Sequence, residues 1–217
     1  MPLRVLISAG PTHEPIDAVR FIGNRSSGRL GLEMAAAAAE RGWDVILLLG
    51  PVANHSAASS DSRIRLARFL TTDDLAALLD RHQPGADLLI LAAAVADFRP
   101  IEPLRGAKLR GGEAGLTLRL KPTPDLAARC SSRRSPGQRI VAFALEPREE
   151  LIDAALAKLR RKGVDLIVAN PLETLDAETI EAALLGPQGP IDQTPGPVSK
   201  AEFARWLLDR LDPGVAP

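Results

Sequence analysis

The apolar run LRVLIS at residues 3–8, stopped by Gly10-Pro11, and the apolar run VILLL at residues 45–49 enclose the segment that decides the fold. Apolar runs of this length that end at Gly and Pro are typical of buried strands. Between them, residues 27–41 include an alanine-rich stretch suited to a helix that packs closely on a sheet. A strand, a helix and a second strand in this order predict a βαβ unit, which is parallel and right-handed in nearly all proteins.

Strands and helices continue to alternate along the rest of the chain. We expect further strands at residues 64–66, 88–94, 139–145 and 165–169, and a late edge strand at residues 180–185. We expect a helix capped by Asp73, a helix over residues 149–162, and a last helix opened by a capping box of Ser199 and Glu202. The alternation predicts an α/β protein whose parallel sheet is covered by helices on both faces.

Two segments interrupt the alternation. Residues 186–198 are rich in Pro and Gly and predict a loop. Residues 98–121 are polar and glycine-rich and end in LTLRL, which predicts a strand at residues 116–120 with no partner in the core sheet. Strand edges are usually paired or covered, so we expect residues 98–121 to form a flap or dimerisation arm in a homodimer. No internal repeat or change in composition marks a boundary, so we expect one domain over residues 1–217.

The composition excludes several classes of protein. Lys and Arg number 27 and Asp and Glu number 27, whereas nucleic-acid-binding domains usually carry a strong positive charge. One cysteine excludes an intrachain disulfide, and the three histidines are not at metal-ligand spacing, so any metal ligands stay unknown. No apolar run suits a membrane span and no signal peptide opens the chain, so we expect a cytoplasmic protein with neither nucleic acid nor membrane as a partner. Tyrosine is absent, which excludes a short-chain reductase with a catalytic tyrosine.

Ligands of open α/β sheets bind beyond the carboxyl ends of the strands, where four loops are expected, at residues 9–28, 95–123, 146–148 and 170–176. The first loop ends in NRSSGRLG at residues 24–31. Free N–H groups at the helix start, the hydroxyls of Ser26 and Ser27 and the close approach that Gly28 permits suit an anion, especially a phosphate. An equally good interpretation is that one serine only caps the helix. The segment matches neither of the standard glycine-rich nucleotide patterns.

Small residues and an aspartate follow the expected strand at residues 88–94. Ala93 and Ala94 leave space for a flat base or a ribose, and the Asp97 carboxylate suits ribose hydroxyls. A buried strand followed by a turn aspartate explains the same residues, and a turn explains Asn24.

Lysines are the next candidates, because only 5 of the 27 basic residues are lysines. Lys108 lies in the expected arm, where an ammonium on a mobile loop can close over phosphates. Lys158 and Lys162 share a helix face, where favourable contact with the helix dipole is the simpler interpretation. Cys130 lies beside alanines in an expected helix, which predicts an inert thiol.

Taken together, these motifs resemble the phosphopantothenate–cysteine ligase family, also called phosphopantothenoylcysteine synthetase. The resemblance covers residues 3–210, and its motifs are GPTHEPIDAVR at 10–20, NRSSG at 24–28, AAAVAD at 92–97, Lys108, TPDL at 123–126, FALE at 143–146 and VAN at 168–170.

The resemblance implies a Rossmann-like fold, a homodimer and a reaction in coenzyme A biosynthesis. In that reaction CTP with Mg²⁺ activates the carboxylate of 4′-phosphopantothenate as an acyl-cytidylate and releases pyrophosphate. The amine of cysteine then attacks, giving 4′-phosphopantothenoylcysteine and CMP. We expect a free-standing ligase, with a separate phosphopantothenoylcysteine decarboxylase as a possible partner.

The family's functional positions fall on residues of this chain. Arg20 and Asn24 correspond to residues near the acyl-cytidylate, and Asp97 and Lys108 to residues that bind CTP, so Asn24, Lys108 and Arg20 are the expected catalytic residues. The remaining expected nucleotide-binding residues are Ser26, Ser27, Gly28, Ala93, Ala94, Pro124, Asp125, Leu126, Ala127, Phe143, Lys158 and Lys162.

The chain departs from the family pattern where Gly111 and Pro122 replace common lysines, which leaves the phosphate contacts there open. Two other functions stay open at this point. One is the same ligase using ATP, and the other is a non-catalytic nucleotide-binding partner of a flavin-dependent decarboxylase.

Overall fold

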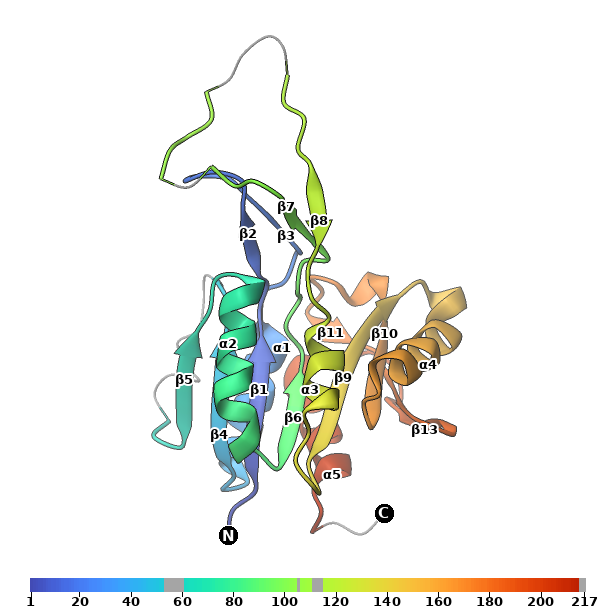
Figure 1. Ribbon diagram of the computed structural model, residues 1–217. Coiled ribbons are helices and arrows are strands. Elements are labelled where there is room, and N and C mark those ends of the chain that lie inside the picture. Colours follow the sequence, from blue (N-terminus) through green and yellow to red (C-terminus); the bar gives the residue numbers. More distant parts are fainter. Residues whose placement is uncertain (53–60, 105, 111–114, 215–217) are drawn as a thin grey trace.

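A sheet of eight strands forms the centre of the molecule (Figure 1). The computed structural model describes residues 1–52, 61–104, 106–110 and 115–214. The sheet order is β13-β12-β10-β9-β6-β1-β4-β5, in which the six strands from β10 to β5 are parallel to one another. These parallel strands are β1 (Arg4–Ala9), β4 (Asp44–Leu49), β5 (Ile64–Arg68), β6 (Leu88–Leu91), β9 (Arg139–Glu146) and β10 (Leu166–Pro171).

The order of the parallel strands confirms the Rossmann-like prediction. Counted along the chain, they lie in the order 3-2-1-4-5-6 typical of dinucleotide-binding domains. The chain starts in the middle of the sheet at β1, winds outward to β5, and then returns to the other side of β1 at β6. A crevice therefore opens between the carboxyl ends of β1 and β6, where the winding direction reverses.

Helices cover both faces of the sheet, as predicted. Two clusters of buried apolar residues, one on each face, hold the helices to it. Helices α1 (Arg29–Glu40) and α5 (Lys200–Leu211) pack on one face, and α2 (Thr72–His82), α3 (Leu126–Ser132) and α4 (Leu151–Lys162) pack on the other. Three short 3-10 helices complete the helical elements of the described chain, η1 (Gln83–Gly85), η2 (Arg148–Glu150) and η3 (Leu172–Thr174).

The C-terminal part of the sheet differs from the prediction. The segment expected as one edge strand divides into β11 (Thr179–Ile180) and β12 (Ala183–Gly186), and β12 is an internal strand. The edge strand is β13 (Gly189–Gln193), which lies in the expected loop and pairs antiparallel with β12. The short β14 (Val198–Ser199) pairs with β11. Pro and Gly in β13 hid this strand, because both are tolerated at a sheet edge.

Two helix starts and one strand end also differ from the prediction. Thr71, and not Asp73, caps α2, with Asp74 completing a capping box. Helix α1 starts at Arg29, two residues later than expected, because Gly28 has a left-handed backbone. Strand β6 ends at Leu91, and the segment after it continues beside the segment after β1, with an isolated parallel bridge between Pro11 and Ala94. The Ser199–Glu202 capping box of α5 is confirmed.

An arm rises from the carboxyl edge of the sheet (Figure 1). Its stem consists of two hairpins, β2 (His13–Pro15) with β3 (Phe21–Gly23), and β7 (Phe98–Pro100) with β8 (Leu120–Pro122). The expected strand at residues 116–120 is wrong except for Leu120. Gly111 and His55 lie outside the described residues. In the described chain, no helix combines the length and hydrophobicity needed to cross a bilayer.

Candidate functional site

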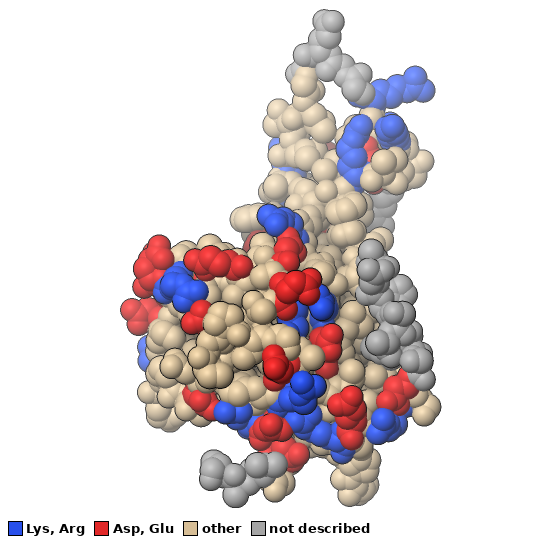
Figure 2. All heavy atoms as spheres, turned by 180° about the vertical axis from the view of Figure 1, so that it is seen from behind, with Lys and Arg blue, Asp and Glu red and all other residues tan. Residues whose placement is uncertain are grey.

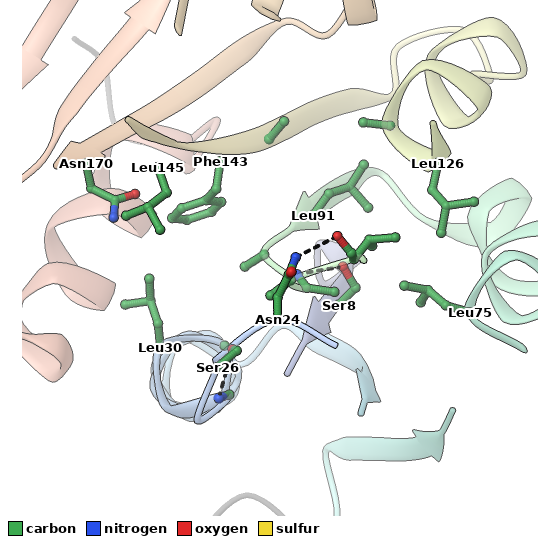
Figure 3. A pocket seen from close by; sticks show the side chains of 18 of the residues that line it. Ser8, Asn24, Ser26, Leu30, Leu75, Leu91, Leu126, Phe143, Leu145 and Asn170 are labelled. Carbon is green, nitrogen blue, oxygen red and sulfur yellow. Dashed lines mark hydrogen bonds between the residues drawn. The ribbon is translucent and has the colours of Figure 1, made fainter. Parts of the chain in front are cut away.

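A cleft of about 840 Å³ lies across the carboxyl ends of the parallel strands, at the point where the winding reverses (Figure 3). This volume suits a small-molecule ligand. Three of the four expected loops line it, contributing residues 23–28, Val95 and Asp97 with Thr123, and Asn170 with residues 174–176. The fourth, at 146–148, does not appear among its described lining residues, although β9 contributes Phe143 and Leu145.

The N-terminus of α1 forms one wall of the cleft. Gly28 occupies the N-cap position with φ 68°, and no side chain caps the helix. The hydroxyls of Ser26 and Ser27 lie 3.4 Å from the N–H groups of Gly28 and Arg29, at the limit of hydrogen bonding. The serine-cap interpretation is therefore wrong. The N–H groups that follow Arg29 in the first turn have no side-chain acceptor among the described residues and can meet an anion, and the positive φ of Gly28 favours glycine there.

Close contacts fix this wall against the sheet. A Cβ at Gly28 would lie 2.9 Å from Cγ1 of Val52, and a Cβ at Gly31 would lie 2.2 Å from Cβ of Ala9. Any side chain at Gly31 would therefore push α1 away from β1. The small residues bring the positive end of the helix close to the crevice.

The segment after β6 runs parallel to the segment after β1 and lines the floor of the cleft. The N–H of Thr12 donates to Ala94 O at 3.2 Å, and the N–H of Ala94 donates to Gly10 O at 2.9 Å. Asn24 contacts the segment after β6, because its Nδ2 donates a hydrogen bond to Val95 O at 2.8 Å (Figure 3). Ala93 and Ala94 line the cleft as predicted. One amide hydrogen and the Oδ1 of Asn24 remain free to meet a ligand.

The opposite wall comes from the start of α3. Thr123 fastens it to the floor, its Oγ1 donating to Ala96 O at 2.6 Å and its N–H to Asp97 O at 3.0 Å. Asp97 lines the cleft, and its carboxylate has no hydrogen-bond partner among the described residues. The other predicted residues of this wall also line the cleft, namely Pro124, Asp125, Leu126 and Ala127.

Lys158 and Lys162 lie on the cleft although they are in the second half of α4. Side chains of a helix lean toward its N-terminus, and α4 begins at the carboxyl edge of the sheet, so both lysines extend toward the cleft. Lys158 pairs with Glu146, and Nζ of Lys162 lies 2.8 Å from both carboxylate oxygens of Asp125. Burial acts to raise the pKa of Asp125, but hydrogen bonds from Lys162 and the N–H of Ala128 outweigh it and hold this pKa below its usual range.

Arg20 and Lys108 lie on the arm, and the described chain brings them together without placing them on its own cleft. Asp17 connects the segment of Arg20 to the segment of Lys108 through hydrogen bonds. Its carboxylate, fully buried, accepts from the N–H groups of Val19, Arg20 and Leu109 at 2.7–3.0 Å and from Nη1 of Arg20 at 2.9 Å. Burial raises the pKa of Asp17, but these hydrogen bonds and the Arg20 charge lower it below its usual range.

The backbone on both sides of Lys108 is therefore held. The N–H of Ala18 donates to Ala107 O at 3.0 Å, before Lys108, and Nη1 of Arg20 donates to Leu109 O at 3.2 Å, after it. Closure of Lys108 over phosphates stays a prediction, and any such motion would involve Arg20 as well. Lys108 and Arg20 belong to one hydrogen-bonded unit.

Sequence reasoning missed several residues at the cleft. Asn170 donates from Nδ2 to Thr174 Oγ1 at 2.7 Å, and both residues line the cleft. Lys200, the first residue of α5, also lines it and is 9% exposed. The capping box revealed where α5 begins, but no sequence signal showed that α5 packs beside α1.

The predicted inert thiol is confirmed, because Cys130 is buried in α3 and burial raises its pKa to about 12. The described residues contain no group of three His, Cys, Asp or Glu side chains placed to hold a metal ion. Mg²⁺ often binds through one or two carboxylates together with substrate phosphates. Asp97 is an unpartnered carboxylate on the cleft, so the residues fit Mg²⁺ as a companion of a bound nucleotide.

Comparison with known proteins gives a consistent family relationship. A model of the family described as "DNA/pantothenate metabolism flavoprotein C-terminal domain" matches residues 2–213. The crystal structure of the C-terminal domain of the coenzyme A biosynthesis bifunctional protein CoaBC is similar with a TM-score of 0.80 and 29% identity, over 96% of this chain and 93% of that one.

Two curated relatives are longer than the chain. The CoaBC protein of Mycobacterium bovis is 42% identical over 176 residues, covering 77% of this chain and 41% of the relative. A protein named cysteine/cysteine sulfinic acid decarboxylase, from an unknown prokaryotic organism, is 39% identical over 213 residues, covering 94% of this chain and 58% of the relative. The chain thus spans between about two fifths and three fifths of the length of these relatives.

Proposed function

The chain belongs to the family of the DNA/pantothenate metabolism flavoprotein C-terminal domain, and from that premise we propose that it is a phosphopantothenate–cysteine ligase of coenzyme A biosynthesis. The observation that carries this proposal is the convergence of the uncapped α1 N-terminus, Asn24 and Asp97 on one cleft at the switch point of the sheet. Such a cleft combines an anion site with groups that can hold a sugar and a reacting carbonyl.

The proposed reaction has two steps. First, a carboxylate oxygen of 4′-phosphopantothenate attacks the α-phosphorus of CTP, and the bond to pyrophosphate breaks. Second, the amine of cysteine attacks the acyl carbon of the acyl-cytidylate, and CMP leaves with the electron pair of the broken C–O bond. Both steps develop negative charge on oxygen, which the N–H groups of α1 and the amide of Asn24 are placed to stabilise.

The arm enters the proposal through a second copy of the chain. Lys108 and Arg20 are absent from the cleft of their own chain, so a homodimer in which the arm crosses to the partner's cleft brings them to the phosphates. Exposed apolar side chains along the described arm support a covered surface there. They are Val19, Phe21, Phe98, Ile101, Leu104, Leu116, Leu118 and Leu120.

CTP is the proposed nucleotide, with Mg²⁺ neutralising its phosphates. Main-chain groups at the floor and at the start of α3 line the cleft, and such groups distinguish the hydrogen-bonding edges of bases. A flavin-dependent decarboxylase is the proposed consumer of the product.

A pyrophosphate-release assay tests the function. The protein is incubated with 4′-phosphopantothenate and each of the four nucleoside triphosphates, with and without cysteine. We expect release with CTP, a limited burst without cysteine, and steady turnover with it. Equal kcat/KM for ATP and CTP would establish the ATP-using alternative. Binding of CTP without any release would establish a non-catalytic module.

A further inference from the structure

Lys200 is a buried lysine without a partner among the described residues. The residue as a whole is 9% exposed and lines the cleft, its Nζ keeps some contact with solvent, and the described chain provides it with neither a hydrogen bond nor an ion pair. Burial of the residue takes part of the hydration from an ammonium group, and no partner among the described residues replaces it. A buried lysine that faces a ligand cleft is therefore expected to receive its counter-charge from the ligand.

Helices α1 and α5 start at the same edge of the sheet. They pack against each other on one face. Arg41, which follows the last residue of α1, donates from Nη2 to Arg205 O in the middle of α5 at 3.1 Å and pairs with Asp209 near the end of α5. The two helices thus run in the same direction, and Lys200 at the start of α5 lies on the side of the uncapped N-terminus of α1. The positive end of α1 and the Lys200 ammonium therefore act on the same part of the cleft.

The neighbouring charges do not neutralise Lys200. Arg25 pairs with Asp176 at 2.6 Å and Arg29 pairs with Glu178. These two pairs join the start of α1 and the residues before it to the segment after β10, and each pair is electrically balanced. Burial foremost, and the charge of Arg29 next, lower the pKa of Lys200, against the opposing effect of the two acidic residues. The two ion pairs are neutral, so the Lys200 ammonium is the charge in this group of five side chains that is left for a ligand.

We propose that Lys200 and the N-terminus of α1 together form a phosphoryl-binding subsite in which the Lys200 ammonium contacts phosphoryl oxygens directly. The proposal rests on the proposed function for the identity of the ligand, since the phosphoryl group belongs either to the nucleotide or to 4′-phosphopantothenate. A phosphoryl group matches the subsite because it accepts both N–H donors and an ammonium.

Lys200→Met tests the subsite, because methionine keeps the apolar stem and removes the charge. Lys200→Arg keeps the charge, and Arg205→Met is a matched control on the exposed side of the same helix. The dissociation constants of inorganic pyrophosphate, CTP, cytidine and 4′-phosphopantothenate are measured by calorimetry for all four proteins. We expect Lys200→Met to weaken at least one phosphorylated ligand about tenfold or more, as for a lost hydrogen bond to a charged group. Lys200→Arg should recover part of this loss, and cytidine binding and the control should be unchanged.

The pattern of losses assigns the phosphoryl group. Weaker pyrophosphate and CTP binding assigns the subsite to the nucleotide, and weaker 4′-phosphopantothenate binding alone assigns it to the acid substrate. Thermal unfolding separates binding from a structural role. Ligand-free Lys200→Met should be at least as stable as the wild type and should gain less stability from the ligand. A large fall in its ligand-free Tm with an unchanged ligand shift would overturn the proposal.

The subsite and the proposed function fail in different ways. Phosphorylated ligands that bind Lys200→Met within twofold of the wild type, in a protein that turns over, would overturn the subsite alone. Lys200-dependent pyrophosphate binding in a protein that shows no turnover would overturn the ligase alone. A wild type that binds no phosphorylated ligand would overturn both.

Discussion

The cleft wall at α1 and the arm hold their predicted residues by different means. At the wall, main-chain hydrogen bonds between the segments after β1 and β6 and close contacts at Gly28 and Gly31 fix the geometry within the sheet. On the arm, one buried carboxylate, Asp17, joins two segments that lie beyond the sheet. Figure 2 shows from behind how the arm extends past the body, with basic side chains near its end.

The comparison shows that one copy of the chain forms the α1 wall of the cleft but does not bring Arg20 and Lys108 to it. The wall is formed by the core that folds the chain, so its residues face the cleft in a single copy. The arm has exposed apolar residues and places its cation outside that cleft. In the proposed function, the fold of one copy supplies the ligand cleft, and a second copy supplies the remaining catalytic groups.

The largest effect is expected for Lys108→Gln. Loss of a cation that stabilises developing phosphate charge should lower pyrophosphate release about 10²–10³-fold, even without cysteine. Quench-flow with labelled CTP measures this release. A retained burst would show that the arm lysine takes no part in the first step.

Mixing then tells whether the arm acts across a dimer. Lys108→Gln changes the arm and Asn24→Asp changes the cleft wall, and each variant alone is expected to be inactive in steady turnover. If the arm serves the partner's cleft, a re-equilibrated equal mixture should regain about a quarter of wild-type activity, because half of the dimers would have one intact site. An arm that serves its own chain predicts no recovery.

A similarly large but later effect is expected for Asn24→Asp in the wall. The variant should release about one pyrophosphate per site and then stall with acyl-cytidylate bound, because loss of a donor at the acyl carbonyl slows the second step about 10²–10³-fold. Single-turnover analysis of bound nucleotide checks this outcome. Loss of the first burst would assign Asn24 to the first step instead.

A smaller effect is expected for Asp17→Asn in the arm. The amide can accept fewer of the four hydrogen bonds, so Arg20 and the backbone beside Lys108 should loosen together and turnover should fall roughly tenfold. Hydrogen exchange should become faster at the N–H groups of Val19 and Leu109 but not in β1 or β6. Arg119→Gln, on the exposed surface of the arm, is the control. Unchanged exchange with lowered turnover would assign Asp17 a different role.

The smallest effect is expected for Asp125→Asn at the cleft rim. Its pair with Lys162 is partly exposed, so the free energy of unfolding at pH 7 should fall by less than about 1 kcal/mol. The native pKa of Asp125 is depressed, so its contribution is present above the unfolded pKa of about 4 and is lost as the pH falls through the native value. Urea unfolding from pH 7 to pH 3 should bring the wild type and the variant together. A difference that stays constant over this range would exclude the ionised pair as its cause.

The buried strands were predictable because apolar runs bounded by Gly and Pro leave few alternatives, as LRVLIS at β1 shows. The α1 wall was predictable from the residue types of the NRSSG segment. Strand β13 was not, because its Gly and Pro give a loop signal and its pairing with β12 is a tertiary contact. Lys200 was not predictable either, since its burial depends on the packing of α5 against α1, residues far apart in the sequence.

The docking of α5 beside α1 has a consequence for synthesis of the chain on the ribosome. The N-terminus of α1 emerges before α5, which carries Lys200 and the core residue Phe203. Nascent chains that lack α5 contain every family motif from GPTHEPIDAVR to VAN but leave the apolar side of α1 uncovered. Such chains should associate with chaperones and bind no nucleotide until α5 has left the exit tunnel.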